Sequence, residues 1–338
     1  MTRTEFGLFL DMATEDSTVG QHVAAYLPLI RLAEAVGFTS LWCGESYPGA
    51  VGGFQHVPSP LLVLAALSQH TSMTLGTAVA LLPVWDPLRL AYDTTVLDQL
   101  TGGRFVLGVG LGAAPTWKQF GLDPATIASR TDESIQALRA LWSGTPFSGR
   151  FFTIDKAIGP RPVRPGGPPI LVGGKIARSA RRAALLGDGF LAGTHFGLPQ
   201  IARQIAVYRD ARAGAGMDPA GGIVSVNRIV VLAATDEEAW ADAAPAVERL
   251  LRRYAALNMF EGAAAFKTTV PGDQAALRAA VSDMAFIGSP ETVAARLAEY
   301  VAMGVGQFQL RPSPTGMPAP IAQRTIELAG TRLLPRFL

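Results

Sequence analysis

Residues 75–89 read Leu-Gly-Thr-Ala-Val-Ala-Leu-Leu-Pro-Val-Trp-Asp-Pro-Leu-Arg, and residues 97–112 read Leu-Asp-Gln-Leu-Thr-Gly-Gly-Arg-Phe-Val-Leu-Gly-Val-Gly-Leu-Gly. The apolar run that ends at Val79 predicts a strand. Asp86-Pro87 predicts the start of a helix, because an aspartate cap followed by proline is typical of a first helical turn. A second apolar run, Phe105 to Val109, predicts the next strand and ends in glycines. Strand, helix and strand in this order form one βα unit of a parallel sheet.

The same alternation continues along the chain and predicts a (β/α)8 TIM barrel. Residues 235–283 break the rhythm, with a charged helix expected from Asp236 to Leu257 and then Gly- and Ala-rich sequence. We therefore expect a single domain over residues 1–338, with an insertion at 235–283 in a late βα loop. The expected strands are 6–10, 39–43, 73–79, 105–109, 170–172, 190–191, 224–233 and 307–310.

Composition narrows the class of protein. The chain has 338 residues, of which 49% are hydrophobic, and these values suit one barrel with a large core. The formal net charge of +2 disfavours a nucleic-acid partner. Cys43 is the only cysteine, so no intramolecular disulfide can form. We find neither a signal-peptide pattern nor an apolar stretch of membrane-spanning length, and we expect a cytoplasmic protein with no membrane partner.

Active sites of barrels lie at the carboxyl ends of the strands, and this rule nominates candidate residues. They include Asp11, Glu45, Ser46, Ala78, Val79, Gly110, Gly112, Gly173, Gly174, Lys175, Gly193, Thr194 and His195.

Two glycine-rich turns are candidates for cofactor binding. Gly173-Gly174-Lys175 precedes a predicted helix, where backbone amides and the helix N-terminus favour a phosphate; the alternative is a plain turn with a solvated lysine. Gly108-x-Gly110-x-x-Ala113 matches a relaxed dinucleotide fingerprint. That turn follows the fourth strand, with Pro115 close behind, which disfavours a Rossmann first turn and favours backbone close to a flat ring.

Groups for proton transfer are few. His56 and His195 lie on expected active-face loops, and histidine exchanges a proton near neutral pH. Asp11 is a candidate base, or else a strand-end residue bonded to nearby backbone amides. No metal-ligand spacing and no Ser-His-Asp pattern is present, so we expect no metal.

Three stretches together resemble the bacterial luciferase-like flavin-dependent oxidoreductases. They are residues 75–112, residues 129–145 with Arg130 and Glu133, and residues 168–191 with Pro-Pro-Ile-Leu-Val-Gly-Gly and Gly-Asp-Gly-Phe. The resemblance implies a barrel, often dimeric, that binds reduced FMN or the deazaflavin coenzyme F420. It is weakest at 235–283, as in the variable insertion of that family.

Carried over by position, the resemblance implies roles for individual residues. Ala78-Val79 would be a non-proline cis peptide behind the flavin ring, and Gly110 and Gly112 would let backbone approach the ring. Glu45 resembles the acidic residue at the end of strand two. Residues expected to hold the phosphate, the ribityl chain or other parts of the cofactor are Arg130, Gly173, Gly174, Lys175, Thr77, Gly193 and Thr194.

Ser46 departs from the family pattern, because members commonly carry histidine there. The acid–base residue is therefore open among Asp11, Ser46, His56 and His195.

Three functions remain, in this order. The first is a monooxygenase that takes reduced FMN from a separate reductase and uses oxygen to oxidise a small apolar organic substrate. The second is a coenzyme F420-dependent oxidoreductase that transfers hydride without oxygen. The third is a flavin-binding protein without turnover, suggested by Ser46. The family resemblance also leads us to expect a homodimer.

Overall fold

The computed structural model describes residues 4–14, 18–47, 55–56 and 59–338. Strands and helices alternate along the chain, and the fold is a (β/α)8 barrel, as predicted. The chain forms two compact units, one of residues 1–41, 192–206 and 223–338 and the other of residues 42–191 and 207–222. The barrel strands are β1 (Glu5–Leu10), β3 (Ser40–Cys43), β5 (Thr74–Thr77), β7 (Phe105–Gly110), β10 (Ile170–Gly173), β11 (Gly189–Ala192), β12 (Ile223–Leu232) and β14 (Gln307–Arg311).

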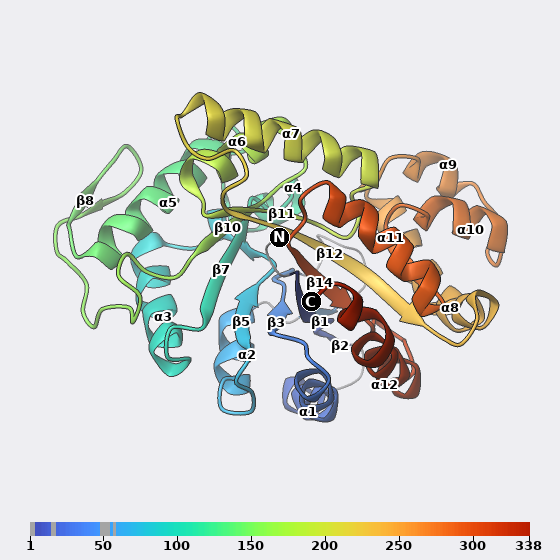
Figure 1. Cartoon of the computed structure of the whole chain (residues 1–338). Coiled ribbons are helices and arrows are strands. Elements are labelled where there is room, and N and C mark those ends of the chain that lie inside the picture. The colour runs from blue at the N-terminus through green and yellow to red at the C-terminus, as the bar shows by residue number, and fades with distance from the viewer. Residues whose placement is uncertain (1–3, 15–17, 48–54, 57–58) are drawn as a thin grey trace. The chain divides into compact units, whose positions relative to one another are not determined.

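In the first unit, β14 lies between β1 and β12, and it pairs with both as a parallel strand (Figure 1). Glu5 and Ser225 both lie opposite Gln307. The last part of β12 pairs instead with β13 (Ala285–Gly288), a short strand that the sequence did not predict. Other elements of this unit are β2 (Ala13–Thr14), α1 (Val19–Ala35), α11 (Pro290–Ala302) and α12 (Ala319–Leu328), and α7 (Leu198–Gly214) begins in it.

The expected insertion folds as a helical layer on β12 and β13. The charged helix is confirmed as α8 (Asp236–Ala256), and Thr235 caps it by accepting a hydrogen bond from the amide of Glu238. Two shorter helices follow, α9 (Ala263–Lys267) and α10 (Gln274–Val281), and Figure 1 shows them beside α8. Val247, Phe266 and Leu277 bury their side chains in the shared core, which gives the Ala-rich segment a fixed structure.

In the second unit, β7 lies between β5 and β10, and β10 pairs onward with β11. The predicted strand over 73–79 ends at Thr77, and β6 (Ala80–Leu81) then pairs with the end of β7. The next helix, α3 (Pro87–Leu100), begins as predicted at Asp86, whose carboxylate accepts hydrogen bonds from the amides of Leu88 and Arg89.

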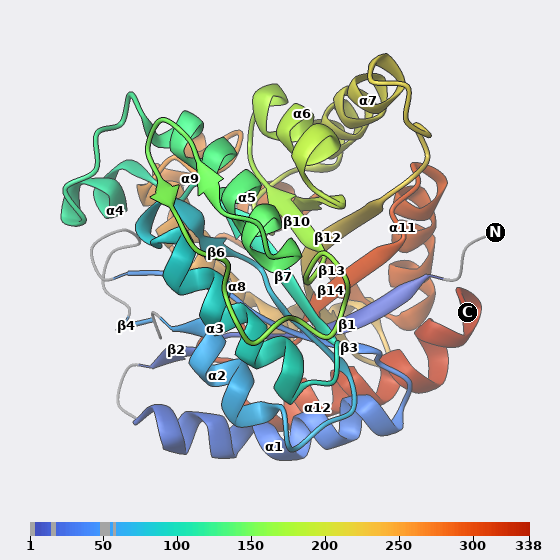
Figure 2. The same ribbon diagram turned by 90° about the vertical axis from the view of Figure 1, so that its left-hand side faces the viewer.

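Helix α5 (Ile127–Ser143) packs beside α3, as Figure 2 shows. A small hairpin, β8 (Phe147–Ser148) with β9 (Thr153–Ile154), follows α5 within the Gly- and Pro-rich excursion before β10. The remaining elements of this unit are α2 (Pro60–Leu67), β4 (Gln55–His56), α4 (Ala114–Gln119) and α6 (Ala177–Leu186).

Among the described residues, every helix is too short or too polar to cross a membrane.

Candidate active site

The carboxyl ends of β5, β7 and β10 meet around the side chain of Val79. The peptide bond between Ala78 and Val79 is cis, as the family resemblance implies. A Cβ atom added to Gly110 would lie 2.7 Å from Val79 Cγ2, and one added to Gly173 would lie 3.3 Å from Val79 Cγ1. Because glycine carries no Cβ, the Val79 side chain packs directly against the backbone of both strand ends.

Residues on either side of this cluster hold the backbone of β7. The hydroxyl of Thr77 is buried and donates to the carbonyl of Gly108 at 2.7 Å. Beyond the strand, Gly112 has a φ of +72°, which favours glycine. Trp117 donates its indole N–H to the carbonyl of Leu111 at 2.6 Å. The turn that follows β7 is thus fixed by side chains of its own unit.

Glu45 is a buried carboxylate that ties neighbouring segments together. Its Oε2 accepts hydrogen bonds from the amide of Leu81 at 2.5 Å and from the indole of Trp85 at 3.0 Å, while Oε1 accepts from the hydroxyl of Tyr47 at 2.6 Å. Burial raises the pKa of Glu45, and the three hydrogen bonds oppose that rise. The next residue, Ser46, is half-buried, and within the described part of the chain its hydroxyl makes no hydrogen bond.

Arg130 in α5 is a cation with unused hydrogen-bonding capacity. Its guanidinium lies 5.4 Å from the ring centre of Phe151 and 4.8 Å from that of Phe152. Its Nε is buried and finds no acceptor among the described residues. The same helix is joined to α6 by Arg182, which donates to the carboxylate of Asp132. The Arg130 guanidinium lies against the turn between β8 and β9, where an added acceptor would satisfy it.

The start of α6 has the features expected of a phosphate site. The helix begins after Ile176, which provides no side-chain cap, and its first turn carries no acidic residue. A Cβ added to Gly174 would lie 2.2 Å from the side chain of Ser179, so the turn needs glycine to lie this close to the helix. Lys175 is exposed beside that turn. Free amides at a helix N-terminus, with nearby cations, favour a phosphate.

The end of β11 enters a buried polar network of the first unit. The hydroxyl of Thr194 donates to Asn227, and the carbonyl of Gly193 accepts from the buried guanidinium of Arg228 at 3.2 Å. The ring of His195 meets that of Phe196 edge-on, with centres 4.5 Å apart. Gly193 and Thr194 therefore hold the strand end, and His195 extends beyond it.

Asp11 is engaged in a buried ion pair with Arg311, a residue that the rule of strand ends did not nominate. Its Oδ2 accepts from the Arg311 guanidinium and from the amide and hydroxyl of Thr315 at 2.7 and 2.9 Å. Arg311 also donates to the hydroxyl of Tyr254 at 3.2 Å, and the Tyr254 ring lies 5.8 Å from that of His195. This arrangement matches the alternative in which Asp11 is a structural strand-end residue.

Arg311 was not nominated because the last strand was predicted one residue too short. The sequence predicted that strand to stop at Leu310, whereas β14 runs to Arg311, so the rule of strand ends nominates Arg311 once the strand is one residue longer. Tyr254 lies inside α8 and carries no local signal of this kind.

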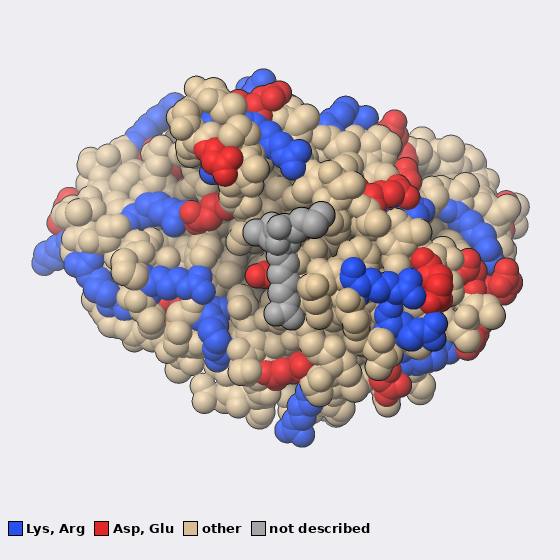
Figure 3. All heavy atoms as spheres, viewed as in Figure 1, with Lys and Arg blue, Asp and Glu red and all other residues tan. Residues whose placement is uncertain are grey.

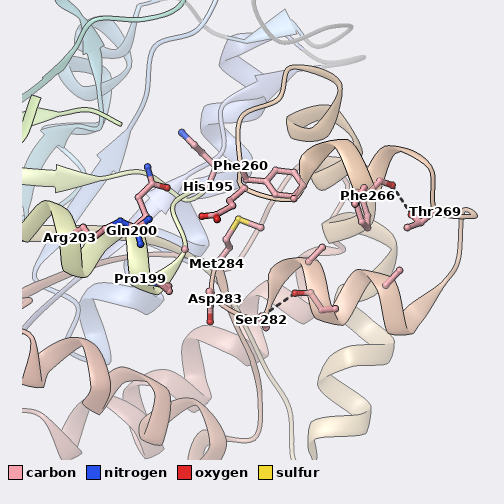
Figure 4. Close-up of a pocket in the computed structure, with 17 residues that line it drawn as sticks. His195, Pro199, Gln200, Arg203, Phe260, Phe266, Thr269, Ser282, Asp283 and Met284 are labelled. Atoms are coloured by element: carbon pink, nitrogen blue, oxygen red, sulfur yellow. Dashed lines mark hydrogen bonds between the residues drawn. The ribbon is translucent and has the colours of Figure 1, made fainter. Parts of the chain in front are cut away.

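His195 also lines a cavity of about 590 Å³ in the first unit (Figure 4). The start of α7 supplies Pro199, Gln200 and Arg203 on one side. The insertion and the residue after it, Met284, supply the other side. The labelled residues there are Phe260, Phe266, Thr269, Ser282, Asp283 and Met284.

The structure thus groups the predicted residues into sets within each unit. The second unit brings together Thr77, Ala78, Val79, Gly110 and Gly173. The first unit groups Asp11 and His195 through Arg311 and Tyr254. His56 lies in β4, and its side chain is outside the described part of the structure.

On the face seen in Figure 3, acidic and basic side chains of the described residues are interspersed. No three His, Cys, Asp or Glu side chains within the described ranges are grouped so that they could hold a metal ion.

Comparison with known proteins matches residues 4–307 to the model of the luciferase-like monooxygenase family. The 4-hydroxyprotoasukamycin monooxygenase of Streptomyces nodosus subsp. asukaensis is 34% identical over 206 residues, which are 59% of this chain and 54% of that protein. The FMNH2-dependent dimethylsulfone monooxygenase of Pseudomonas fluorescens is 29% identical over 299 residues, which are 82% of this chain and 79% of that protein. The match to the first of these relatives thus spans about half of its length.

Among solved structures, monooxygenase RslO1 from Streptomyces bottropensis has a TM-score of 0.85 to this chain. The two are 28% identical, and the alignment covers 99% of this chain and 100% of that one. The likeness therefore extends over the whole barrel, including the insertion.

Proposed function

Because the chain belongs to the luciferase-like monooxygenase family, a family of flavin-dependent oxidoreductases, we propose that it is the oxygenase of a two-component system. It takes reduced FMN from a separate reductase and uses oxygen to oxidise an apolar organic substrate. The observation that carries the proposal is the cluster around Val79, where the cis peptide Ala78–Val79 packs against Gly110 and Gly173 at positions that the family resemblance assigns to the flavin site. The FMNH2-dependent relative supports reduced FMN as the form that binds.

The residues of the second unit fit this cofactor. The phosphate would lie at the start of α6, near Gly174 and Lys175. Arg130, which the family resemblance also assigns to the phosphate, lies against Phe151 and Phe152, and its buried Nε has no acceptor among the described residues. The ring would lie against the backbone at Val79 and Gly110. When bound, reduced FMN supplies the electrons with which oxygen is activated.

The chain's own residues then orient and shelter the reaction. Glu45 fixes the segments around Leu81 and Trp85 by accepting their N–H groups. His195 can hold or release a proton where the first unit's cavity meets the end of β11. Ser46 carries no such proton near neutral pH, so His195 is our candidate for the acid–base group.

Coenzyme F420 is the alternative cofactor, and the Gly-Asp-Gly-Phe segment of the family resemblance does not separate it from FMN. In Gly-Asp-Gly-Phe, the carboxylate of Asp188 accepts from the amide of Ile170 at 2.7 Å and pairs with Arg139. The motif therefore stabilises the start of β10 and does not discriminate between the two cofactors.

The decisive experiment titrates the purified protein anaerobically with reduced FMN and with reduced F420, side by side, by fluorescence. We expect tight binding of reduced FMN alone, weakened about tenfold in Gly110→Ala because the new methyl group displaces Val79. Gly20→Ala is the matched control, since a Cβ there meets nothing within 4 Å. If only reduced F420 binds, the proposed oxygenation would be rejected in favour of hydride transfer.

Two further parts of the proposal are tested separately. Reduced FMN that reoxidises without product across a broad substrate panel would favour a flavin-binding protein without turnover. Rapid NADH oxidation by the purified protein alone would contradict the proposal of a separate reductase. We also propose a cytoplasmic homodimer, and light scattering at micromolar concentration would give twice the mass of the chain.

A further inference from the structure

The cavity beside His195 has a size and lining that select among organic molecules. Its volume of about 590 Å³ lies within the range of pockets that enclose drug-sized ligands. Ala276, Ala279 and Ala280, on one face of α10, contribute only methyl groups to its wall. A molecule as small as a sulfone or a ketone of a few carbons would leave most of this space unfilled.

The buried part of the lining is apolar. Phe260, Phe266 and Met284 are each less than a tenth exposed, and they carry no charge. Of the charged residues that line the cavity, Arg203 and Glu261 are exposed, whereas Asp283 pairs with Arg296 at 3.5 Å. No buried charge in the described lining is present to compensate a charged ligand, and burying an unpaired charge is costly.

One side of the cavity is polar and well fixed. His195 and Gln200 lie there, opposite Phe266 (Figure 4). The His195 ring is flanked edge-on by Phe196 and Tyr254, and Tyr254 is in turn held by Arg311. A ring held in this way presents a hydrogen-bonding group in a defined place.

From these observations we infer that this cavity binds the substrate, and that the substrate is a bulky, uncharged, ring-containing molecule with a hydroxyl or carbonyl oxygen facing His195. Phe260, Phe266 and the alanines of α10 are the specificity-determining residues. That the bound molecule is a substrate rests on the proposed function. Its binding to the cavity does not require flavin.

The test uses fluorescence titration of the flavin-free protein with 1-hydroxypyrene, pyrene and 1-pyrenecarboxylate, and competition by dimethyl sulfone. We expect 1-hydroxypyrene to bind at least about tenfold more tightly than 1-pyrenecarboxylate, because the carboxylate would lose hydration without a buried partner. Dimethyl sulfone should not compete. Equal affinity for the carboxylate, or competition by dimethyl sulfone at similar concentration, would overturn the assigned chemistry.

Variants of α10 test the location. Ala276→Phe fills the cavity and should weaken 1-hydroxypyrene binding about tenfold or more, and Ala280→Phe should do the same. Ala275→Phe is the matched control on the same helix, because Ala275 is exposed and does not line the cavity. Unchanged binding in both filling variants, with their fold intact by circular dichroism, would refute the assignment.

His195→Phe tests the polar side of the cavity, because it removes the hydrogen-bonding nitrogens and keeps an aromatic ring in their place. This variant should bind pyrene as the wild type does while losing its preference for 1-hydroxypyrene over pyrene, and a preserved preference would remove His195 from the site. The reduced-FMN titration is independent of all these readouts. Failure of FMN binding alone would thus reject the proposed function, and failure of probe binding alone would reject this inference.

Discussion

At the residue scale, Glu45 shows how burial couples a site residue to pH. Because burial raises its pKa, the folded protein binds this proton more tightly than the unfolded chain does. The contribution of Glu45 to stability is therefore greatest below its ordinary pKa and declines as pH rises through the higher pKa of the folded state. We expect Glu45→Gln to lessen that decline in the free energy of unfolding, measured with urea between about pH 4 and about pH 8.

Glu291 provides a control of opposite sign. A backbone hydrogen bond at the start of α11, with Arg332 and Arg336 nearby, lowers its pKa. The contribution of Glu291 to stability is present above its unfolded pKa and is lost as pH falls. Glu291→Gln should therefore reduce the increase in the free energy of unfolding that accompanies a rise in pH. Identical slopes for wild type, Glu45→Gln and Glu291→Gln would contradict both expectations.

Arg311 joins the end of β14 to Asp11, which follows the end of β1 in the first unit. Arg311→Met leaves the carboxylate of Asp11 buried without its cation and should lower the free energy of unfolding by about 3–5 kcal/mol. In the exposed pair of Arg89 with Asp93, Arg89→Met should cost less than about 1 kcal/mol. Urea denaturation of the two variants makes the comparison, and equal losses would show that the buried pair has no special role.

At the scale of elements, one side chain of α5 organises the excursion before β10. Glu133 accepts hydrogen bonds from three successive amides, those of Arg150, Phe151 and Phe152, at 2.7–3.0 Å. Glu133→Ala should cost about 2–4 kcal/mol, because these amides lose a charged acceptor, and should speed their hydrogen exchange. Asp123→Ala, which removes one exposed turn bond to Ala125, is the control. Unchanged exchange at residues 150–152 would contradict this role.

At the scale of the whole molecule, the two compact units are each assembled from separate stretches of chain. Both β3 and α7 contain residues of each unit, so neither unit is a continuous segment that could be cut out. We therefore expect one cooperative transition in calorimetry, with calorimetric and van't Hoff enthalpies in a ratio of about 1. Two resolved transitions would show that the single domain predicted for residues 1–338 is wrong.

The barrel could be predicted from sequence because its signals are local. Apolar runs and amphipathic stretches alternate, and caps such as Asp86-Pro87 mark helix starts within one or two residues. The sequence did not predict β13 because it directly follows the Gly- and Ala-rich segment that breaks the rhythm of apolar runs; its length was not the obstacle, since β3, β5 and β10 are also four residues long. The rule of strand ends also found Val79, Gly110 and Gly173, since parallel strands direct their carboxyl ends to one side.

Tertiary structure decided which of these residues meet and what they bind. Asp11 and Arg311 are 300 positions apart, and no local pattern predicts that they pair. The cavity beside His195 depends on how α7, α9 and α10 pack, which one-dimensional periodicity does not specify. The sequence by itself determined the order of strands and the backbone of the candidate cofactor site, because each is encoded within a few neighbouring residues. Partners and cavity shape came from the fold, because they depend on distances between side chains that are far apart in the chain.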